Sequence, residues 1–316
     1  MAPPNLRWPI LLSIAAAVVT IGMKGAAYAV TGSVGLFSDA LESGVNLFAA
    51  VVAYVSLVYA ARPADPSHAY GHEKIEYLSS GLEGALIVVA GLGTAGYAVR
   101  RLVYPEPLAN LEIGSVIALA ASGVNFVTAR VLLHHGRKYR SVVLEADGQH
   151  LMSDVWTSVG VVVGIGLVLL TGLGFLDSVV AVAVGLNIVW TGGELIRRSF
   201  DGLMDHALPA AEQDQIRGVI SAHLPPGATF HALRTRQAGS RRFAEFHLLV
   251  AGDLSVRAAH HLGHTIEDAL VAAVPGLEVV FHIEPVDERE SWEGEYLERL
   301  GEPSQPMMPP GAADGR

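Results

Sequence analysis

The stretch VVLEADGQHLMSDVWTSVGVVVGIGLVLLT, residues Val142–Thr171, places acidic and histidine residues inside a long apolar run. A helix needs roughly 20 mostly apolar residues to cross the hydrocarbon core of a bilayer, and this stretch is long enough. It contains the ionisable residues Asp147, His150 and Asp154. Because such side chains are energetically costly inside a span, their presence predicts a function within the membrane.

Five further apolar blocks of similar length lie in the first 200 residues. They cover residues 9–28, 36–61, 75–103, 113–134 and 175–200. The chain of 316 residues is 51% hydrophobic and 16% charged, with a mean hydropathy of +0.40, which is too apolar for an ordinary soluble protein. We therefore expect a multi-pass α-helical membrane domain with six transmembrane helices over residues 1–208.

The basic residues of the short connections predict the orientation of this domain. The connections around residues 31–35, 105–110 and 172–174 carry no Lys or Arg. The other two connections and the end of the sixth block carry Arg62, Lys74, Arg137, Lys138, Arg140, Arg197 and Arg198. By the positive-inside rule, both termini are cytoplasmic and the protein lies in the inner (cytoplasmic) membrane.

Composition and missing motifs exclude several classes of function. The chain has no cysteine, so a bound metal must use histidine, carboxylate and amide ligands. A net charge of −10 argues against nucleic-acid binding. The sequence has neither an H-E-x-x-H metalloprotease motif nor a G-x-x-x-x-G-K-[ST] nucleotide loop, so we expect no enzyme activity and no ATP-driven step.

Polar residues recur at the same spacing, i, i+3 and i+7, in the second and fifth blocks. This spacing places each set on one helical face; the sets are Asp39, Glu42 and Asn46, and Asp147, His150 and Asp154. If the two helices face each other, four nitrogen and oxygen ligands converge, the number that a tetrahedral divalent cation requires. These four are Glu42, Asn46, His150 and Asp154.

The alternative interpretation is that these polar groups hydrogen-bond to one another and hold the helices together. Two matched sets in different blocks favour the metal site. Asp39 and Asp147 lie one turn away, towards opposite ends of their helices, and can serve as vestibule or proton-relay groups. Glu83 and Lys24 each stand alone in their blocks; we take Lys24 as structural and leave the role of Glu83 open.

The chemistry of His150 predicts coupling to protons. Its imidazole must be neutral to bind a cation, so metal entry competes with a proton. Histidine ordinarily titrates at about pH 6.5, within the range in which cells work. Exchange of a metal for protons therefore needs no further machinery.

These features resemble the cation diffusion facilitator family, and the resemblance covers nearly the whole chain. It is carried by Ser-Asp-Ala-Leu-Glu at residues 38–42 and by the pair His150 and Asp154. It implies six spans, a cytoplasmic C-terminal domain, a homodimer, and an intramembrane site on the four ligands named above. The family usually has His or Asp at the position of Glu42 and Asp at that of Asn46, so this chain departs from the pattern in the second block.

The connection PADPSHAYGHEK, residues 63–74, resembles a loop of the bacterial zinc/iron branch of the family. The resemblance implies a second metal site on Asp65, His68 and His72. The alternative is a solvated loop with incidental histidines. Lys74 resembles one member of an ion pair whose other member is Asp205.

The chain beyond residue 208 is compatible with water. Its patterns predict helices at 209–223 and 255–274, and strands at 229–237, 241–251 and 278–284. This order suits a small ferredoxin-like α+β domain over residues 209–290, which resembles the metallochaperone-like dimerisation domain of the family. Residues 291–316, first acidic and then rich in Pro and Gly, predict a disordered tail.

Eight of the thirteen histidines lie beyond residue 200. The resemblance implies a binuclear cytoplasmic metal site near the dimer interface, on His231, His247, His260, His282 and Glu284. The alternative is a histidine-rich surface without ligands.

Together these features predict proton-coupled efflux of a divalent transition metal, which would be both the substrate and a regulator. Zinc suits a site of histidine and carboxylates; iron(II), cobalt, nickel and manganese stay open, and magnesium and calcium are disfavoured. Because Asn46 weakens the intramembrane site, the alternative is a non-transporting membrane metal sensor or scaffold. A membrane metalloenzyme is a poorer alternative, since a catalytic motif is missing.

Overall fold

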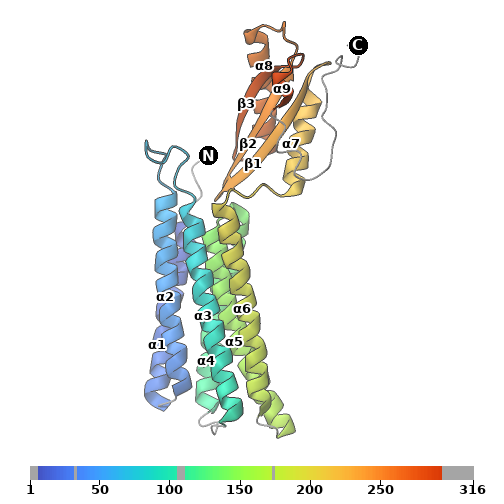
Figure 1. The fold of residues 1–316 in the computed structure, drawn as a ribbon. Helices are drawn as coiled ribbons and strands as arrows, with labels where there is room; N and C mark the ends of the chain where they lie inside the picture. Colours follow the sequence, from blue (N-terminus) through green and yellow to red (C-terminus); the bar gives the residue numbers. More distant parts are fainter. Residues whose placement is uncertain (1–5, 32–33, 105–110, 173–174, 294–316) are drawn as a thin grey trace. The chain divides into compact units, whose positions relative to one another are not determined.

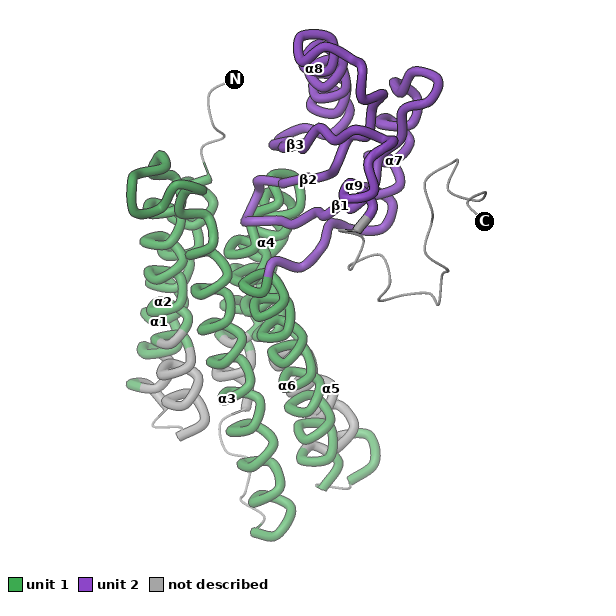
Figure 2. The backbone as a smooth tube through the Cα atoms, turned by 45° about the horizontal axis from the view of Figure 1, so that its top comes forward, with its two compact units in different colours: residues 1–204 green, residues 205–316 purple. Residues whose placement is uncertain are grey.

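The computed structural model of the chain describes residues 6–31, 34–104, 111–172 and 175–293, without the side chains of some residues inside the helices. The chain divides into two compact units, residues 1–204 and 205–316 (Figure 2). We call them the helical unit and the α+β unit, and each is described by itself.

The helical unit consists of six long helices that run alongside one another (Figure 1). They are α1 (Arg7–Thr31), α2 (Val34–Ala60), α3 (Ile75–Val103), α4 (Leu111–Tyr139), α5 (Val142–Thr171) and α6 (Phe175–Leu203). Each coincides with one of the six predicted apolar blocks. Among the described residues, three segments meet the length and composition of a membrane span: Arg7–Ala26, Ile75–Val103 and Ser178–Leu203.

Glycines bring α3 and α6 into close contact. A Cβ atom added at Gly84 would lie 3.0 Å from the carbonyl oxygen of Gly192, and one added at Gly91 would lie 2.9 Å from that of Gly185. Small residues at such crossings let two helix backbones approach within a bilayer. A separate cluster of buried residues connects α1, α2, α4 and α5, and includes Ile10, Leu57, Leu132 and Leu144.

The α+β unit contains a three-stranded sheet with two helices packed on it (Figure 1). Its elements are α7 (Ala210–His223), β1 (Thr229–Ala238), β2 (Arg241–Val250), α8 (Val256–Ala273), β3 (Leu277–Pro285) and α9 (Glu290–Glu293). The strand order is β1-β2-β3, with β1 antiparallel to β2 and β2 parallel to β3. The observed order is the predicted one, and each predicted bound lies within one residue of the observed bound.

The sheet of the α+β unit has one face against the helices and one that carries histidines. Phe246 and Leu248 of β2 are fully buried in a core with residues of α7 and α8. Because successive strand residues point to opposite faces, His247 lies on the other face. At the end of the unit, α9 reaches three residues into the predicted tail, and residues 294–316 of that tail lie outside the described residues.

Candidate metal sites

The first group of predicted ligands lies between α2 and α5, deep in the helical unit. The amide Nδ2 of Asn46 donates a hydrogen bond to the carboxylate of Asp154, and Oδ1 of Asn46 lies 2.5 Å from Nε2 of His150. All three side chains are buried, with exposed fractions of 4% for Asn46, 4% for His150 and 9% for Asp154. Side chains from two helices therefore meet at one point.

The hydrogen bonds of this group indicate which nitrogen of His150 faces Asn46 with a hydrogen. Because Nδ2 of Asn46 donates to Asp154, Oδ1 must accept, and His150 carries a hydrogen on Nε2. The amide thus engages the imidazole and the carboxylate that a cation would bind. Glu42, the fourth predicted ligand, and Asp39 lie outside the residues whose side chains are described, and their roles stay predictions.

Two residues from other helices complete the surroundings of this group. Asn125 of α4 donates to Asp154 over 3.4 Å, and the carboxylate of Glu83 on α3 lies 4.0 Å from Nδ1 of His150. Glu83 is 2% exposed, and neither its carboxylate oxygens nor Nδ1 of His150 has a hydrogen bond among the described residues. A buried carboxylate in that condition favours a cation or a proton beside it. The sequence left Glu83 open because only the packing of α3 on α5 reveals its neighbour.

Asp147 lies on α5 beside the same group. It is 2% exposed and accepts a hydrogen bond from Ser13 on α1. Its charge is close enough to those of Glu83 and Asp154 for the carboxylates to repel one another. Three carboxylates near one buried point favour the entry of positive charge.

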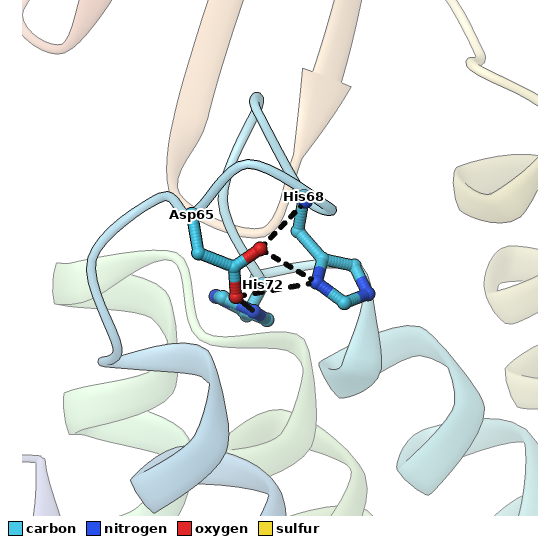
Figure 3. A group of neighbouring side chains, drawn as sticks. All are labelled: Asp65, His68 and His72. Atoms are coloured by element: carbon cyan, nitrogen blue, oxygen red, sulfur yellow. Dashed lines mark hydrogen bonds and ion pairs between the residues drawn. The ribbon is translucent and has the colours of Figure 1, made fainter.

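The second group of predicted ligands occupies the connection between α2 and α3 (Figure 3). The carboxylate of Asp65 lies 3.1 Å from Nδ1 of His68 and 3.1 Å from Nε2 of His72. His72 is almost fully buried, whereas Asp65 and His68 are about half exposed. The backbone N–H groups of Ser67 and His68 each donate to Asp65 over 2.8 Å, which holds the carboxylate towards the imidazoles.

The geometry of the second group suits a cation with one open position. One ligand atom from each of the three residues lies within 4.8 Å of the others, and three protein ligands leave room for water. Desolvation acts to raise the pKa of Asp65, but the hydrogen bonds from His68 and Ser67 lower it below its usual value. The carboxylate is therefore ready to bind a cation at any pH near neutrality.

The third group lies on the face of the sheet opposite α7 and α8. His231, His247 and His282 pair across β1, β2 and β3, so their imidazoles stand side by side. The carboxylate of Glu284 is 3.2 Å from a ring nitrogen of each of the three. One acidic side chain thus gathers three potential ligands held by adjacent strands.

Two local features shape this third group. The pairing of β1 with β2 shifts register between His231 and Arg234, and Ala232 there adopts a φ of +50°. A bulge of this kind re-aims the side chains next to it. The ring of Trp292 on α9 lies 5.9 Å from that of His231, so the indole borders the group.

The structure does not bring His260 to the third group within one chain. His260 lies on α8, with its ring 4.4 Å from that of His264. Gly263 of α8 packs against Phe281 of β3, and the next residue, His282, points to the opposite face of the sheet. The expected gathering of His260 with the other ligands is therefore wrong for a single chain, and a role in a dimer stays a prediction.

The predicted ion pair of Lys74 with Asp205 would join the two units and stays a prediction. Within the α+β unit, the carboxylate of Asp205 lies 3.5 Å from the guanidinium of Arg236.

Comparison with known proteins decides the family. The cation efflux transmembrane domain matches residues 10–204, and the cytoplasmic domain of cation efflux proteins matches residues 208–286. The chain belongs to the cation diffusion facilitator family. It is 49% identical over 286 residues to the uncharacterized transporter sll1263 of Synechocystis, covering 90% of this chain and 91% of the relative.

Two other relatives illustrate the range of similarity within the family. The cation-efflux pump FieF of Shewanella oneidensis is 31% identical over 276 residues, covering 87% of this chain and 92% of that protein. A solved structure of the Zn form of CzrB is 44% identical; the match covers 27% of this chain and 97% of that one, with a TM-score of 0.26. The helical unit is thus a transmembrane domain of a metal-cation efflux family, and the α+β unit is its cytoplasmic domain.

Proposed function

We propose that this protein exports a divalent transition-metal cation, with zinc as the first candidate, in exchange for protons across the inner membrane. The observation that supports it most is the buried meeting of His150 and Asp154 with Asn46 inside a transmembrane domain. An imidazole and a carboxylate are first-rank ligands for zinc, iron, cobalt, nickel and manganese. Because the chain has no cysteine, such a site binds the metal without a thiolate ligand. Weaker binding suits a substrate that must be released again.

The hydrogen bonds of the site suggest how metal and protons exchange. A cation can bind Nε2 of His150 only when that nitrogen has no hydrogen, and it can bind Asp154 only in place of the amide of Asn46. On the cytoplasmic side, metal entry takes one proton from a doubly protonated His150, and the remaining hydrogen of the ring stays on Nδ1. On the other side, a more acidic medium protonates the site again and the metal leaves. Alternating access of this kind moves one ion outward and protons inward.

The other two groups fit regulation and supply of the same metal. The loop group at Asp65 is half exposed, so an ion can reach it from water. The group around Glu284 lies on rigid strands in the cytoplasmic domain. In a homodimer with both termini cytoplasmic, metal bound there would raise transport when the ion is plentiful, and His260 could then contribute from a second chain.

A second candidate function is a metal sensor or scaffold that does not transport. One observation favours it: the amide of Asn46 already satisfies both His150 and Asp154, which lowers the gain from binding a cation. In that case the cytoplasmic domain would bind metal without any flux.

Zinc flux in proteoliposomes under an imposed pH gradient separates the two candidates. The native chain is compared with Asp154→Asn and with Glu267→Gln, a matched control that removes one carboxylate from the surface of α8. We expect flux that follows the pH gradient in the native chain and the control, and none in Asp154→Asn. If zinc does not move, iron(II), manganese, cobalt and nickel are offered in turn. Metal binding without flux of any of these ions would overturn the transport proposal in favour of the sensor.

A further inference from the structure

One face of α4 changes from apolar to basic along its length. Exposed apolar side chains occupy its first part: Val116, Leu119, Phe126 and Val127. Exposed basic and histidine side chains follow: Arg130, His134, Arg137 and Lys138. The members of this α4 stripe are adjacent or are three, four or seven residues apart, so a helix with 3.6 residues per turn presents them all on one side.

The change of character coincides with the end of the bundle where a membrane surface is expected. Trp8, at the start of α1, is 45% exposed and packs edge-on against His135 of α4, with ring centroids 4.8 Å apart. Tryptophan gathers at the level of lipid headgroups. His135 is flanked by the basic residues of the stripe, which therefore lie at headgroup depth, while the apolar part of the stripe faces the acyl chains.

The basic residues line an open hollow of about 440 Å³. The described lining residues are Arg130, Leu133, His134, Arg137 and Lys138, with no carboxylate among them. Glu145 on α5 attracts Arg137 but is itself partly buried. Among the described residues, neither Arg130 nor Lys138 forms an ion pair. Three permanent cations around one hollow select an anion of high charge density.

We propose that this hollow binds the phosphate of an anionic phospholipid headgroup. A soluble anion would need only the charges, whereas the exposed apolar residues directly before Arg130 provide a surface for acyl chains on the same helical face. Arginine suits phosphate because its planar guanidinium offers two parallel hydrogen bonds. Lysines and arginines near a surface each strengthen binding to anionic lipid about fivefold.

Lipid binding is measured by native mass spectrometry on the full chain in detergent, titrated with phosphatidylglycerol or with phosphatidylcholine. The test variant is Arg130→Gln/Arg137→Gln/Lys138→Gln. The matched control, Arg62→Gln/Arg197→Gln/Arg198→Gln, removes the same charge from outside the hollow. A third variant, Arg130→Lys/Arg137→Lys, keeps the charge and guards against loss of folding. Inorganic phosphate is added in a separate arm.

We expect the native chain to prefer phosphatidylglycerol roughly tenfold or more, the test variant to lose that preference, and the control and the lysine variant to retain it. An equal preference in the test variant and the native chain would overturn the proposal. Displacement of the lipid by millimolar inorganic phosphate would also overturn it, since the hollow would then be a site for soluble anions. The assay measures no flux, so its result is independent of whether the protein transports zinc.

Discussion

The potential metal ligands of the helical unit and those of the sheet are held in opposite ways. Between α2 and α5, the amide of Asn46 joins His150 to Asp154, so each of these three described side chains already has a hydrogen bond that a metal must replace. On the sheet, the carboxylate of Glu284 faces three imidazoles, and adjacent strands hold them in place. The first arrangement favours exchange, and the second favours retention.

The difference in burial points the same way. The described members of the intramembrane group are at most 9% exposed, whereas the sheet group runs from His231, which is 3% exposed, to His282, which is 70% exposed. A cation in the buried site loses all its water and must be released by a change in the protein. A cation on the sheet stays in contact with water on the side of His282. This contrast accords with the proposed roles, transport for the buried group and regulation for the sheet group.

The largest expected effect separates the two sites completely. Asp154→Asn removes the only charged ligand described in the intramembrane group and keeps the size of the side chain. We expect zinc flux in proteoliposomes to fall at least ~100-fold, because a buried cation loses its compensating charge. Zinc binding to the sheet group should not change. It is measured by the fluorescence of Trp292, and the Trp292→Phe variant gives the background signal. Flux within a few fold of the native value would place the transport site elsewhere.

The reverse change tests the sheet group. Glu284→Gln keeps the shape of the side chain but removes the charge that faces His231, His247 and His282. We expect zinc affinity measured by Trp292 fluorescence to fall roughly 10- to 100-fold, the range seen when a supporting carboxylate is lost from a metal site. Maximal flux at saturating zinc should stay within about threefold of native. Glu278→Gln, which removes a carboxylate from the same strand away from the group, is the control. Unchanged affinity would contradict the assignment of Glu284.

Much of this architecture could be predicted from the sequence, because its signals are local. The six apolar blocks predicted the helices, and the spacing of i, i+3 and i+7 placed each set of polar residues on one helical face. That Asn46 meets His150 and Asp154 follows from the packing of α2 on α5. Glu83 and His260 could not be placed in this way. The position of Glu83 opposite His150 depends on how α3 packs on α5, and the separation of His260 from the sheet group depends on which face α8 covers.

A change at Asn46 sharpens the contrast between exchange and retention. Asn46→Asp adds a charged ligand and removes the amide that donates to Asp154. We expect zinc to bind the intramembrane site about tenfold more tightly, and we expect turnover to slow because release now requires protonation of a second carboxylate. The apparent KM and the maximal flux at several external pH values measure both effects. Tighter binding with faster turnover would show that release from this site does not limit transport.

The smallest expected effect concerns Glu83, whose carboxylate lies 4.0 Å from Nδ1 of His150. When a cation binds Nε2, the hydrogen of the neutral imidazole must reside on Nδ1, the nitrogen that faces the carboxylate of Glu83. A carboxylate behind a ligating histidine orients the ring and strengthens its bond to the metal. Glu83→Gln should therefore raise the apparent KM for zinc about tenfold while the maximal flux changes less than threefold. Glu83→Asp should recover part of the loss, since it restores the charge at a longer distance. A loss of maximal flux with an unchanged KM would show instead that Glu83 acts in the conformational step and not in positioning His150.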